Sequence, residues 1–596
     1  MALTLIFFFY KIIDVKMSIS NIDFRGACMP KIEVNKKYFF SLLGKEYSME
    51  ELEDILTFAK AELDSSKEEY DREDNIKIEL NDTNRPDLWS EIGLARCLNI
   101  LIGHKSSNRI LYKSFLSKTE EDANERIIRV SSSLKDIRAY IAGFLIRGKK
   151  ISDAELASVI QTQEKLSTNY GRKRRTLAMG IYRASLISWP LSYSTETSSF
   201  AFSPLGFENS MSIKDILKKH PKGIEYAHIF DGIERYPILK DVKEATLSFP
   251  PIINSNDIGS VKEGDDLLFV EFTGQEKNIV LLACNIVACD FADLGWEVLP
   301  VKVENEDETI VCPIYFQKPI KISISYINRL LGSSFSMSEV IFALQKMDVS
   351  SAILDSNTLE VLPSPYRNDY LHPIDVVEDV MIAIGLSSFE VATPKDFTIG
   401  RLLPSTTLGR KIKKLLIGMG YEELIFNYLG SGDDFITKMG ISGENVIEIS
   451  NPISENYQFV RPSILPSLLY SESSSHTSSY PHKIFEIGKV AVIDEASSYG
   501  TTTLNHLSFL TAEKDANYNK IASEVAALFY YLDIDYNVLE EEDTRFISGR
   551  VASINVAGKK IGVFGELSPE LLTRWEISMP SVALEISLDS LPLPID

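Results

Sequence analysis

Residues 365–385 are expected to contain a helix with a ridge of acidic side chains. Asp375, Glu378 and Asp379 stand at positions i, i+3 and i+4, so on a helix they share one face. The opposite face carries only apolar side chains, those of Val376, Val377, Val380, Met381 and Ile384. Because such a face must be covered, we predict an amphipathic helix that begins near Pro373 and packs on a core.

A fourth carboxylate, Asp369, lies upstream of this helix and beyond a strand-like run at residues 358–362. A turn there would swing Asp369 toward the ridge, and Mg²⁺ prefers oxygen ligands of this kind. The candidate ligands of a divalent cation are therefore Asp369, Asp375, Glu378 and Asp379. The alternative is that acidic side chains in a first helical turn are favoured by the helix dipole and are simply solvated.

The length of the chain requires several domains. Single cores stop growing beyond roughly 250 to 300 residues, and this chain has 596. Its apolar content of 44% and charged content of 24% are those of an ordinary globular protein. We predict a multidomain α+β protein.

Strand and helix patterns divide the chain into four parts. Residues 29–109 read as a small α/β unit, and residues 110–303 as strands separated by long loops. Residues 304–396 contain a helix, helix, strand, helix pattern that ends in the acidic helix. Residues 397–596 combine strands, expected to be mostly antiparallel, with flanking helices.

The net charge of −22 and the pI near 5.0 argue against a protein that binds nucleic acid unaided through a broad electrostatic surface. Any contact with RNA must be local or shared with a partner. The densest basic run is GRKRRT at residues 171–176, which a solvated loop end would also explain. The cysteines, none in a CxxC pair, indicate a reducing compartment; they are Cys28, Cys97, Cys284, Cys289 and Cys312.

The first 28 residues contain a short apolar run at residues 3–10, far below the roughly 20 residues that span a bilayer. We expect residues 1–28 to be an extension of uncertain reality, with Met17 and Met29 as alternative starts. No Walker-type loop, GxGxxG, HExxH or GxSxG motif is found. The residues alone thus indicate a cytosolic multidomain protein with one candidate cation site.

Seven sequence blocks, in order, carry a resemblance that extends from Met29 to the C-terminus. They are MPKIEVNKKYFFSLLG, NDTNRPDLWSEIGLARCL, QEKLSTNYGRKRRTLAMGIYR, LSFPPIINS, PYRNDYLHPIDVVEDVMIAIG, VRPSILPSLL and KIFEIGKV. On these blocks the chain resembles the beta subunit of phenylalanyl-tRNA synthetase, of the archaeal and eukaryotic cytosolic type. The resemblance rests on the order of the blocks, since any one of them alone is a weak signal.

The resemblance implies a cytoplasmic α2β2 heterotetramer in which the alpha subunit binds ATP and phenylalanine and joins phenylalanine to tRNA(Phe). It implies an N-terminal domain at residues 29–109 and a B3/B4 tRNA-editing domain at residues 110–303. A winged-helix-like B5 domain at residues 304–396 and a class II synthetase catalytic-like domain at residues 397–596 follow. It also places the magnesium site of the family on the four carboxylates named above.

The editing pocket of the family maps onto Leu239, Ser248, Glu271 and Thr273. A pocket that selects tyrosine over phenylalanine must satisfy one additional hydroxyl, which a polar group such as Glu271 does and an apolar wall does not. Hydrolysis would need an oriented water near Ser248 or Thr273, although no histidine base is evident beside either in sequence. The alternative is that both are ordinary hydroxyls at strand ends.

The C-terminal part resembles a class II core without its chemistry. Class II catalysis places an acidic residue two positions after an arginine, whereas Arg461 is followed by Pro462 and Ser463. We therefore expect no aminoacylation by this chain alone, and an apolar face, to which residues 418–424 contribute, that pairs with the alpha subunit. The main hypothesis is an editing-competent subunit, and the alternative is a non-editing scaffold that only assembles the alpha subunit and guides tRNA. A free-standing nucleic-acid binder is disfavoured by the net charge of −22.

Overall fold

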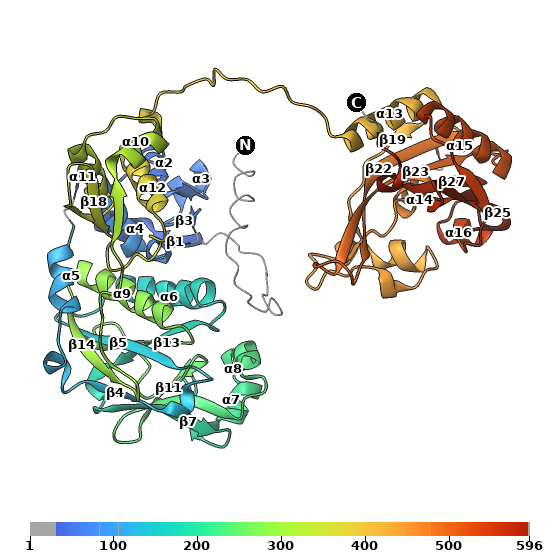
Figure 1. The fold of residues 1–596 in the computed structure, drawn as a ribbon. Coiled ribbons are helices and arrows are strands. Elements are labelled where there is room, and N and C mark those ends of the chain that lie inside the picture. The colour runs from blue at the N-terminus through green and yellow to red at the C-terminus, as the bar shows by residue number, and fades with distance from the viewer. Residues whose placement is uncertain (1–30, 83, 105–106, 476, 594–596) are drawn as a thin grey trace. The chain divides into compact units, whose positions relative to one another are not determined.

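The structure, a computed structural model, describes residues 31–82, 84–104, 107–475 and 477–593. These form two compact units, residues 31–392 and residues 393–593 (Figure 1). The expectation for residues 1–28 lies outside the described residues. Within the described ranges, no helix is both long and apolar enough to cross a membrane.

The first module of residues 31–392 is a small three-stranded sheet, in the order β1-β3-β2, covered by helices. Its strands are β1 (Lys31–Asn35), β2 (Ala61–Leu63) and β3 (Asn75–Leu80), and its helices are α1 (Lys36–Leu43), α2 (Met49–Leu56), α3 (Lys67–Arg72) and α4 (Glu91–Leu101). Alternate residues of β1 are buried, as expected for a strand with one face on a core. This confirms the predicted α/β unit.

The second module is built on a ten-stranded sheet with the strand order β12-β11-β10-β7-β4-β14-β5-β13-β6, in which β15 also pairs with β14. The strands are β4 (Ile127–Val130), β5 (Tyr140–Arg147), β6 (Leu177–Arg183), β7 (Leu191–Thr197), β10 (Arg235–Lys240), β11 (Thr246–Phe249), β12 (Ile253–Asn254), β13 (Leu267–Gly274), β14 (Glu297–Glu304) and β15 (Thr309–Cys312). A separate pair consists of β8 (Ala201–Phe202) and β9 (Met211–Ser212).

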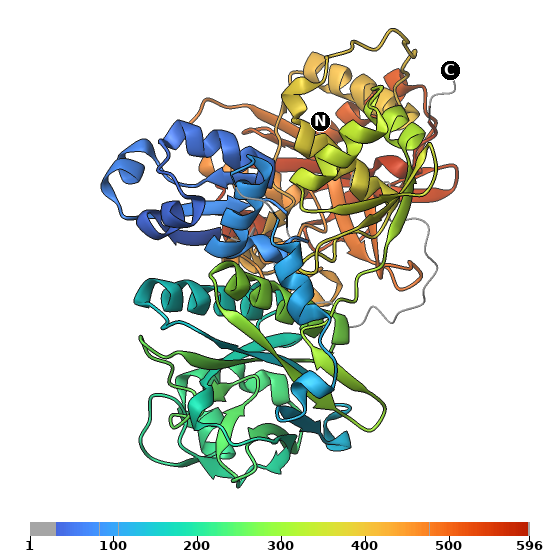
Figure 2. The same ribbon diagram turned by 90° about the vertical axis from the view of Figure 1, so that its left-hand side faces the viewer.

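Helices cover this sheet. They are α5 (Arg109–Leu116), α6 (Asp153–Lys165), α7 (Ile213–Lys219), α8 (Pro221–Tyr226) and α9 (Lys277–Asp293). Helices α6 and α9 lie side by side on one face, as both views show (Figures 1 and 2). Almost every side chain of α9 is buried, because the helix lies between this sheet and α4. A helix that is apolar all round is typical of such a position.

The third module holds the acidic helix. Its strands, in the sheet order β16-β18-β17, are β16 (Ile320–Ser323), β17 (Ser350–Ile353) and β18 (Thr358–Leu362), and its helices are α10 (Ile324–Leu331), α11 (Met337–Lys346) and α12 (Pro373–Ile384). Helix α12 begins at the predicted proline and buries Val376, Val377 and Val380. Gly385, with φ of 91°, ends it in a conformation that disfavours other residues. The predicted amphipathic helix is confirmed.

Residues 393–593 form a seven-stranded sheet, in the order β19-β22-β23-β27-β26-β25-β24, with helices on both faces. The strands are β19 (Glu422–Glu423), β22 (His482–Ile493), β23 (Thr501–Ala512), β24 (Asn537–Glu540), β25 (Phe546–Val556), β26 (Lys559–Leu567) and β27 (Ser581–Ser587), with a separate pair β20 (Leu429–Gly430) and β21 (Phe459–Val460). The helices are α13 (Pro404–Gly418), α14 (Leu465–Ser474), α15 (Tyr518–Leu532) and α16 (Pro569–Arg574). Successive residues of β27 enter different cores: Leu584 packs with α13 and α15, and Ala583 with α14 and α16. Except for β19, which runs parallel to β22, all the strand pairs are antiparallel, as predicted.

Candidate functional site

The first candidate site lies at the start of α12, where Asp375 caps its own helix. Asp375 Oδ2 accepts hydrogen bonds from the backbone amides of Leu371 and His372, each at 2.7 Å. These amides lie just before the helix, where donors have no intrahelical partner. The carboxylate thus has a local role that its position at the third residue of the helix already favours.

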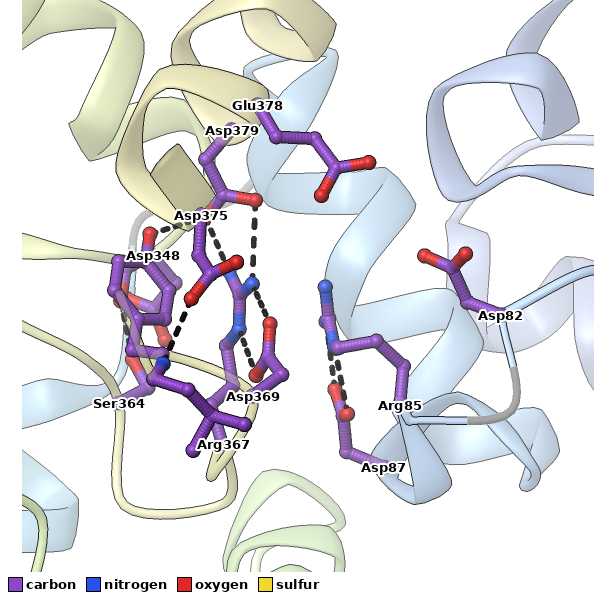
Figure 3. Close-up of polar contacts among 12 residues, drawn as sticks. Asp82, Arg85, Asp87, Asp348, Ser364, Arg367, Asp369, Asp375, Glu378 and Asp379 are labelled. Atoms are coloured by element: carbon purple, nitrogen blue, oxygen red, sulfur yellow. Dashed lines mark hydrogen bonds and ion pairs between the residues drawn. The ribbon is translucent and has the colours of Figure 1, made fainter. Parts of the chain in front are cut away.

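Arg367 occupies the space between two of the other predicted ligands, Asp369 and Asp379 (Figure 3). Its Nε lies 3.0 Å from Asp369 Oδ1, and its Nη1 lies 2.5 Å from Asp379 Oδ2. The guanidinium is buried, and Tyr370 donates its hydroxyl to Asp379 as well. Burial alone would raise the pKa of Asp369, but the charges of Arg367 and Arg85 outweigh it and lower that pKa to about 2.

Glu378 points away from this cluster toward the first module. It forms an ion pair with Lys60, which also pairs with Asp82 at 3.1 Å. Nearby, Arg85 holds Asp87 through two hydrogen bonds of 2.8 Å, with its guanidinium facing Arg367 in Figure 3. The third module is therefore joined to the first by alternating charges.

The four carboxylates do not fit a shared magnesium ion as they are arranged. Asp369 and Asp379 meet around a guanidinium, Asp375 binds backbone amides, and Glu378 binds a lysine. In the part of the chain that the structure describes, no group of three or more His, Cys, Asp or Glu side chains could hold a metal ion. Arg367, which the spacing argument did not consider, supplies the positive charge instead.

The second candidate site lies on the ten-stranded sheet and contains the four predicted editing residues. Leu239 of β10 is the register partner of Ser248 of β11. Glu271 and Thr273 stand two residues apart on β13, so their side chains point to the same face. All four are buried. The strand order places β10 and β11 at one part of the sheet and β13 at another, and the contacts of Tyr182 connect them.

Tyr182 of β6 donates its hydroxyl to Glu271 Oε1 at 2.8 Å, and the same hydroxyl lies 3.4 Å from Asn254 Oδ1. Asn254 is the register partner of Ser248. Glu271 Oε2 and Ser248 Oγ are buried and have no hydrogen-bond partner among the described residues. Burial raises the pKa of Glu271 to about 7, although the hydrogen bond from Tyr182 opposes the shift. Two orphan polar atoms in a buried site are rare and call for an explanation such as a ligand.

Gly180 makes room for this pair. It is the register partner of Glu271 across the β6–β13 pairing. A Cβ on Gly180 would overlap the hydroxyl of Tyr182 and would lie 2.7 Å from Glu271 Oε1. The absence of a side chain at this position therefore lets the tyrosine and the glutamate meet.

Thr273 is held from behind by Arg138, which is buried. Arg138 Nε donates to Thr273 Oγ1 at 2.9 Å, and its Nη2 donates to the Thr273 carbonyl at 2.6 Å. Tyr193 in turn donates its hydroxyl to the Arg138 carbonyl at 3.1 Å. The Thr273 hydroxyl thus accepts a hydrogen bond and keeps its own proton to donate.

Sequence reasoning did not find Tyr182, Gly180 or Arg138. Their local sequence marks them at most weakly, because each acts on a residue far along the chain. One weak signal was present: Gly180 and Tyr182 stand two apart in a strand-like run, and glycine inside a strand often marks a close approach.

In residues 393–593, the fully buried Arg461 forms an ion pair with Glu486. Its Nη1 and Nη2 donate to the two oxygens of Glu486 at 3.0 and 2.8 Å, and its Nε donates to the Lys489 carbonyl at 2.9 Å. Glu585 accepts hydrogen bonds from Ser463 and from the Ile464 amide. These groups satisfy one another within the fold.

Comparisons with known proteins match nearly the whole chain. The family model described as the phenylalanyl tRNA synthetase beta chain CLM domain matches residues 390–588, the tRNA synthetase B5 domain matches residues 320–386, and the Phe-tRNA synthetase beta subunit B1 domain matches residues 29–104. The phenylalanine--tRNA ligase beta subunit of Borrelia recurrentis is 46% identical over 94% of this chain and 100% of its own length. That of Borreliella burgdorferi strain ZS7 is 44% identical over 94% of this chain and 99% of its own.

A solved structure is also similar. It is an N-terminal fragment of the phenylalanyl-tRNA synthetase beta subunit from Pyrococcus horikoshii, with 33% sequence identity and a TM-score of 0.55. The match covers 59% of this chain and 99% of that fragment.

Proposed function

The chain belongs to the family of phenylalanine--tRNA ligase beta subunits, an aminoacyl-tRNA synthetase family, and from this premise we propose that it edits. An alpha subunit attaches phenylalanine to tRNA(Phe) with ATP, and this chain hydrolyses Tyr-tRNA(Phe) made in error. The pocket consists of Leu239, Ser248, Glu271 and Thr273.

The observation that carries the proposal is the free oxygen of Glu271. Glu271 Oε2 is buried without a partner among the described residues, while Tyr182 holds Oε1. The phenol of a bound tyrosine offers the donor that this oxygen lacks. Phenylalanine would leave the acceptor unsatisfied, and an unpaired buried polar group costs about 1–3 kcal/mol. A site built around such a hydrogen bond rejects the analogue that lacks the hydroxyl.

The other three residues complete the pocket. Leu239 is a fully buried apolar side chain suited to the aromatic ring. Ser248 has a free hydroxyl, and Thr273 has a hydroxyl proton left to donate. Either group can orient a water that adds to the ester carbonyl, after which the bond to the ribose oxygen breaks and tyrosine and tRNA are released.

The experiment that tests the proposal is hydrolysis of Tyr-tRNA(Phe) by the purified complex of alpha and beta subunits. Glu271→Ala and Ser248→Ala should each slow hydrolysis by about 10–100-fold, the value of one hydrogen bond to a charged or buried partner. Phenylalanine attachment should be unchanged, which serves as the control. A wild-type complex that leaves Tyr-tRNA intact would instead support a non-editing scaffold that assembles the alpha subunit and guides tRNA.

The proposal includes assembly with the alpha subunit into a cytoplasmic α2β2 heterotetramer. In its support, large apolar side chains are exposed on residues 393–593, among them Ile417 (58%), Ile425 (85%) and Ile453 (98%). A contiguous patch of such side chains would be typical of a protein–protein contact site. A class II catalytic-like domain at residues 397–596, a winged-helix-like domain at residues 304–396 and an archaeal and eukaryotic cytosolic type are finer parts of the same proposal.

A magnesium site on the four carboxylates would require them to change partners. Asp369, Asp375, Glu378 and Asp379 would have to give up Arg367, two backbone amides and Lys60 before they could share an ion. Calorimetric titration of the alpha–beta complex with Mg²⁺ tests this. Binding that disappears in Asp375→Asn and Glu378→Gln would support the site, and unchanged binding in both would reject it.

A further inference from the structure

The basic run of the sequence forms a turn with an unusual backbone. It follows a π-helical segment, η6 (Leu166–Tyr170), and precedes β6. Arg172, Lys173 and Arg174 have φ values of 48°, 55° and 66°, in the left-handed region that residues with a Cβ rarely adopt. Backbone hydrogen bonds of 2.7 Å from Lys173 to Thr168 and from Arg174 to Ser167 hold this shape.

Arg174 binds the turn to neighbouring elements through its partly buried side chain. Its Nη1 lies 3.2 and 3.0 Å from the carbonyls of Pro251 and Ile252, its Nη2 lies 2.9 Å from Glu164, and its guanidinium stacks 4.6 Å above the ring of Tyr226. Pro251 and Ile252 belong to the loop that directly follows β11, the strand of Ser248.

Arg138 fastens the same turn to the other pocket strand. Its Nη1 donates to the carbonyls of Arg174 and Arg175, each at 3.1 Å, while its Nε and Nη2 bind Thr273. One guanidinium therefore bridges the basic turn and an expected editing residue. The turn is thus held from two sides, against the loop after β11 and, through Arg138, against Thr273.

The remaining three cations of the turn face solvent. Arg172, Lys173 and Arg175 are exposed, and none forms an ion pair with the described residues, in contrast to Arg174. They are three free positive charges on a chain whose net charge is −22. A chain of that charge repels RNA in general, so an RNA end that reaches the pocket needs a local attraction.

We propose that Arg172, Lys173 and Arg175 anchor the phosphates of the RNA strand whose 3′ end carries the aminoacyl ester into the Glu271 pocket. This rests on the proposed editing function. Phosphate contacts position a nucleic acid without reading its sequence, and a preformed turn provides them at a fixed distance from Thr273. The three side chains form no ion pair with the described residues, so their positive charges are available to bind the phosphates of an RNA strand.

The experiment uses the alpha–beta complex with a triple variant, Arg172→Ala, Lys173→Ala and Arg175→Ala. The KM for Tyr-tRNA(Phe) hydrolysis should rise about tenfold or more, with kcat within about twofold, because the cations bind but do not react. The slope of log KM against log salt should become shallower by about 2, at about 0.7 for each phosphate that the variant no longer binds. The matched control removes three exposed lysines from other elements, Lys113, Lys318 and Lys321, and should leave KM and the slope unchanged.

A KM and salt slope equal to those of the wild type, or a rise equal to that of the control, would overturn the anchor. Equilibrium binding of uncharged tRNA(Phe) is measured in parallel, and the same decrease in salt dependence is expected in the triple variant. If the wild-type complex hydrolyses no Tyr-tRNA, the editing function fails, and this binding measurement still decides for or against the anchor.

Discussion

Tyr182 and Glu271 form a buried hydrogen bond of 2.8 Å between neighbouring strands of one sheet, and it leaves a single oxygen of Glu271 without a partner among the described residues. The chain thus supplies one phenol to the carboxylate from its own fold. The second acceptor, in the proposed function, receives the phenol of the substrate. This pairing determines how the pocket responds to mutation and to pH.

Removing the internal phenol should change the pH dependence of editing. Tyr182→Phe takes away a hydrogen bond that lowers the pKa of Glu271, so this pKa should rise above about 7. If hydrolysis needs ionised Glu271, the midpoint of its pH profile moves upward. The control is Tyr193→Phe, which removes a hydroxyl bound to the Arg138 carbonyl instead. A midpoint that moves equally in both variants would contradict the role given to Tyr182.

Ionisation of the buried Glu271 side chain should lower the stability of the folded chain as the pH rises. Its pKa is about 7 in the folded chain and about 4.3 when exposed, so the folded state binds the proton more tightly. The stability that the folded state gains from this tighter proton binding is fully present below about pH 4.3 and is lost as the pH rises through 7. Glu271→Gln should therefore be more stable than the wild type at pH 8, by up to about 4 kcal/mol, and nearly equal at pH 4. Thermal unfolding of both at the two pH values checks this; equal differences at both would refute it.

The space at Gly180 should be indispensable for the pocket. In Gly180→Ala the new Cβ overlaps the Tyr182 hydroxyl and crowds Glu271, which should cost about 1–3 kcal/mol and abolish Tyr-tRNA hydrolysis. Phenylalanine attachment by the complex should persist. Gly409→Ala in α13 is the matched control, because its Cβ meets nothing within 4 Å among the described residues. Normal hydrolysis by Gly180→Ala would show that Tyr182 and Glu271 need not meet.

Arg367 should be essential for the third module. Arg367→Met leaves the buried carboxylates of Asp369 and Asp379 without their guanidinium, and breaking a buried ion pair costs about 3–5 kcal/mol. The Asp369 part of this stability is present above about pH 4 and is lost as pH falls through about 2, because its folded pKa is lowered. Chemical unfolding at pH 7 measures the loss, with Arg329→Met, an exposed arginine, as control. A loss no larger than in the control would exclude Arg367 as the central cation.

Much of the fold was predictable from local patterns. The apolar periodicity of residues 376–384 and Pro373 at the start of the helix predicted α12, because these signals act within a few turns of chain. Strand and helix patterns likewise predicted the small α/β unit that begins with β1. Strand patterns predicted mostly antiparallel strands in residues 397–596. They did not predict the seven-stranded sheet or its order, with β24 at one edge and β19 at the other, because strand pairing depends on contacts distant in sequence.

The helix and strand repeats alone place Asp375, Glu378 and Asp379 on one helix, and Glu271 and Thr273 on one face of a strand. The partners of these side chains depend on which distant segments the fold brings together. Glu378 meets Lys60 across 318 residues, Glu271 meets Tyr182 across 89, and Thr273 meets Arg138 across 135. A carboxylate shows its charge in sequence, but whether it faces a guanidinium, a phenol or water depends on which distant segment the core brings beside it.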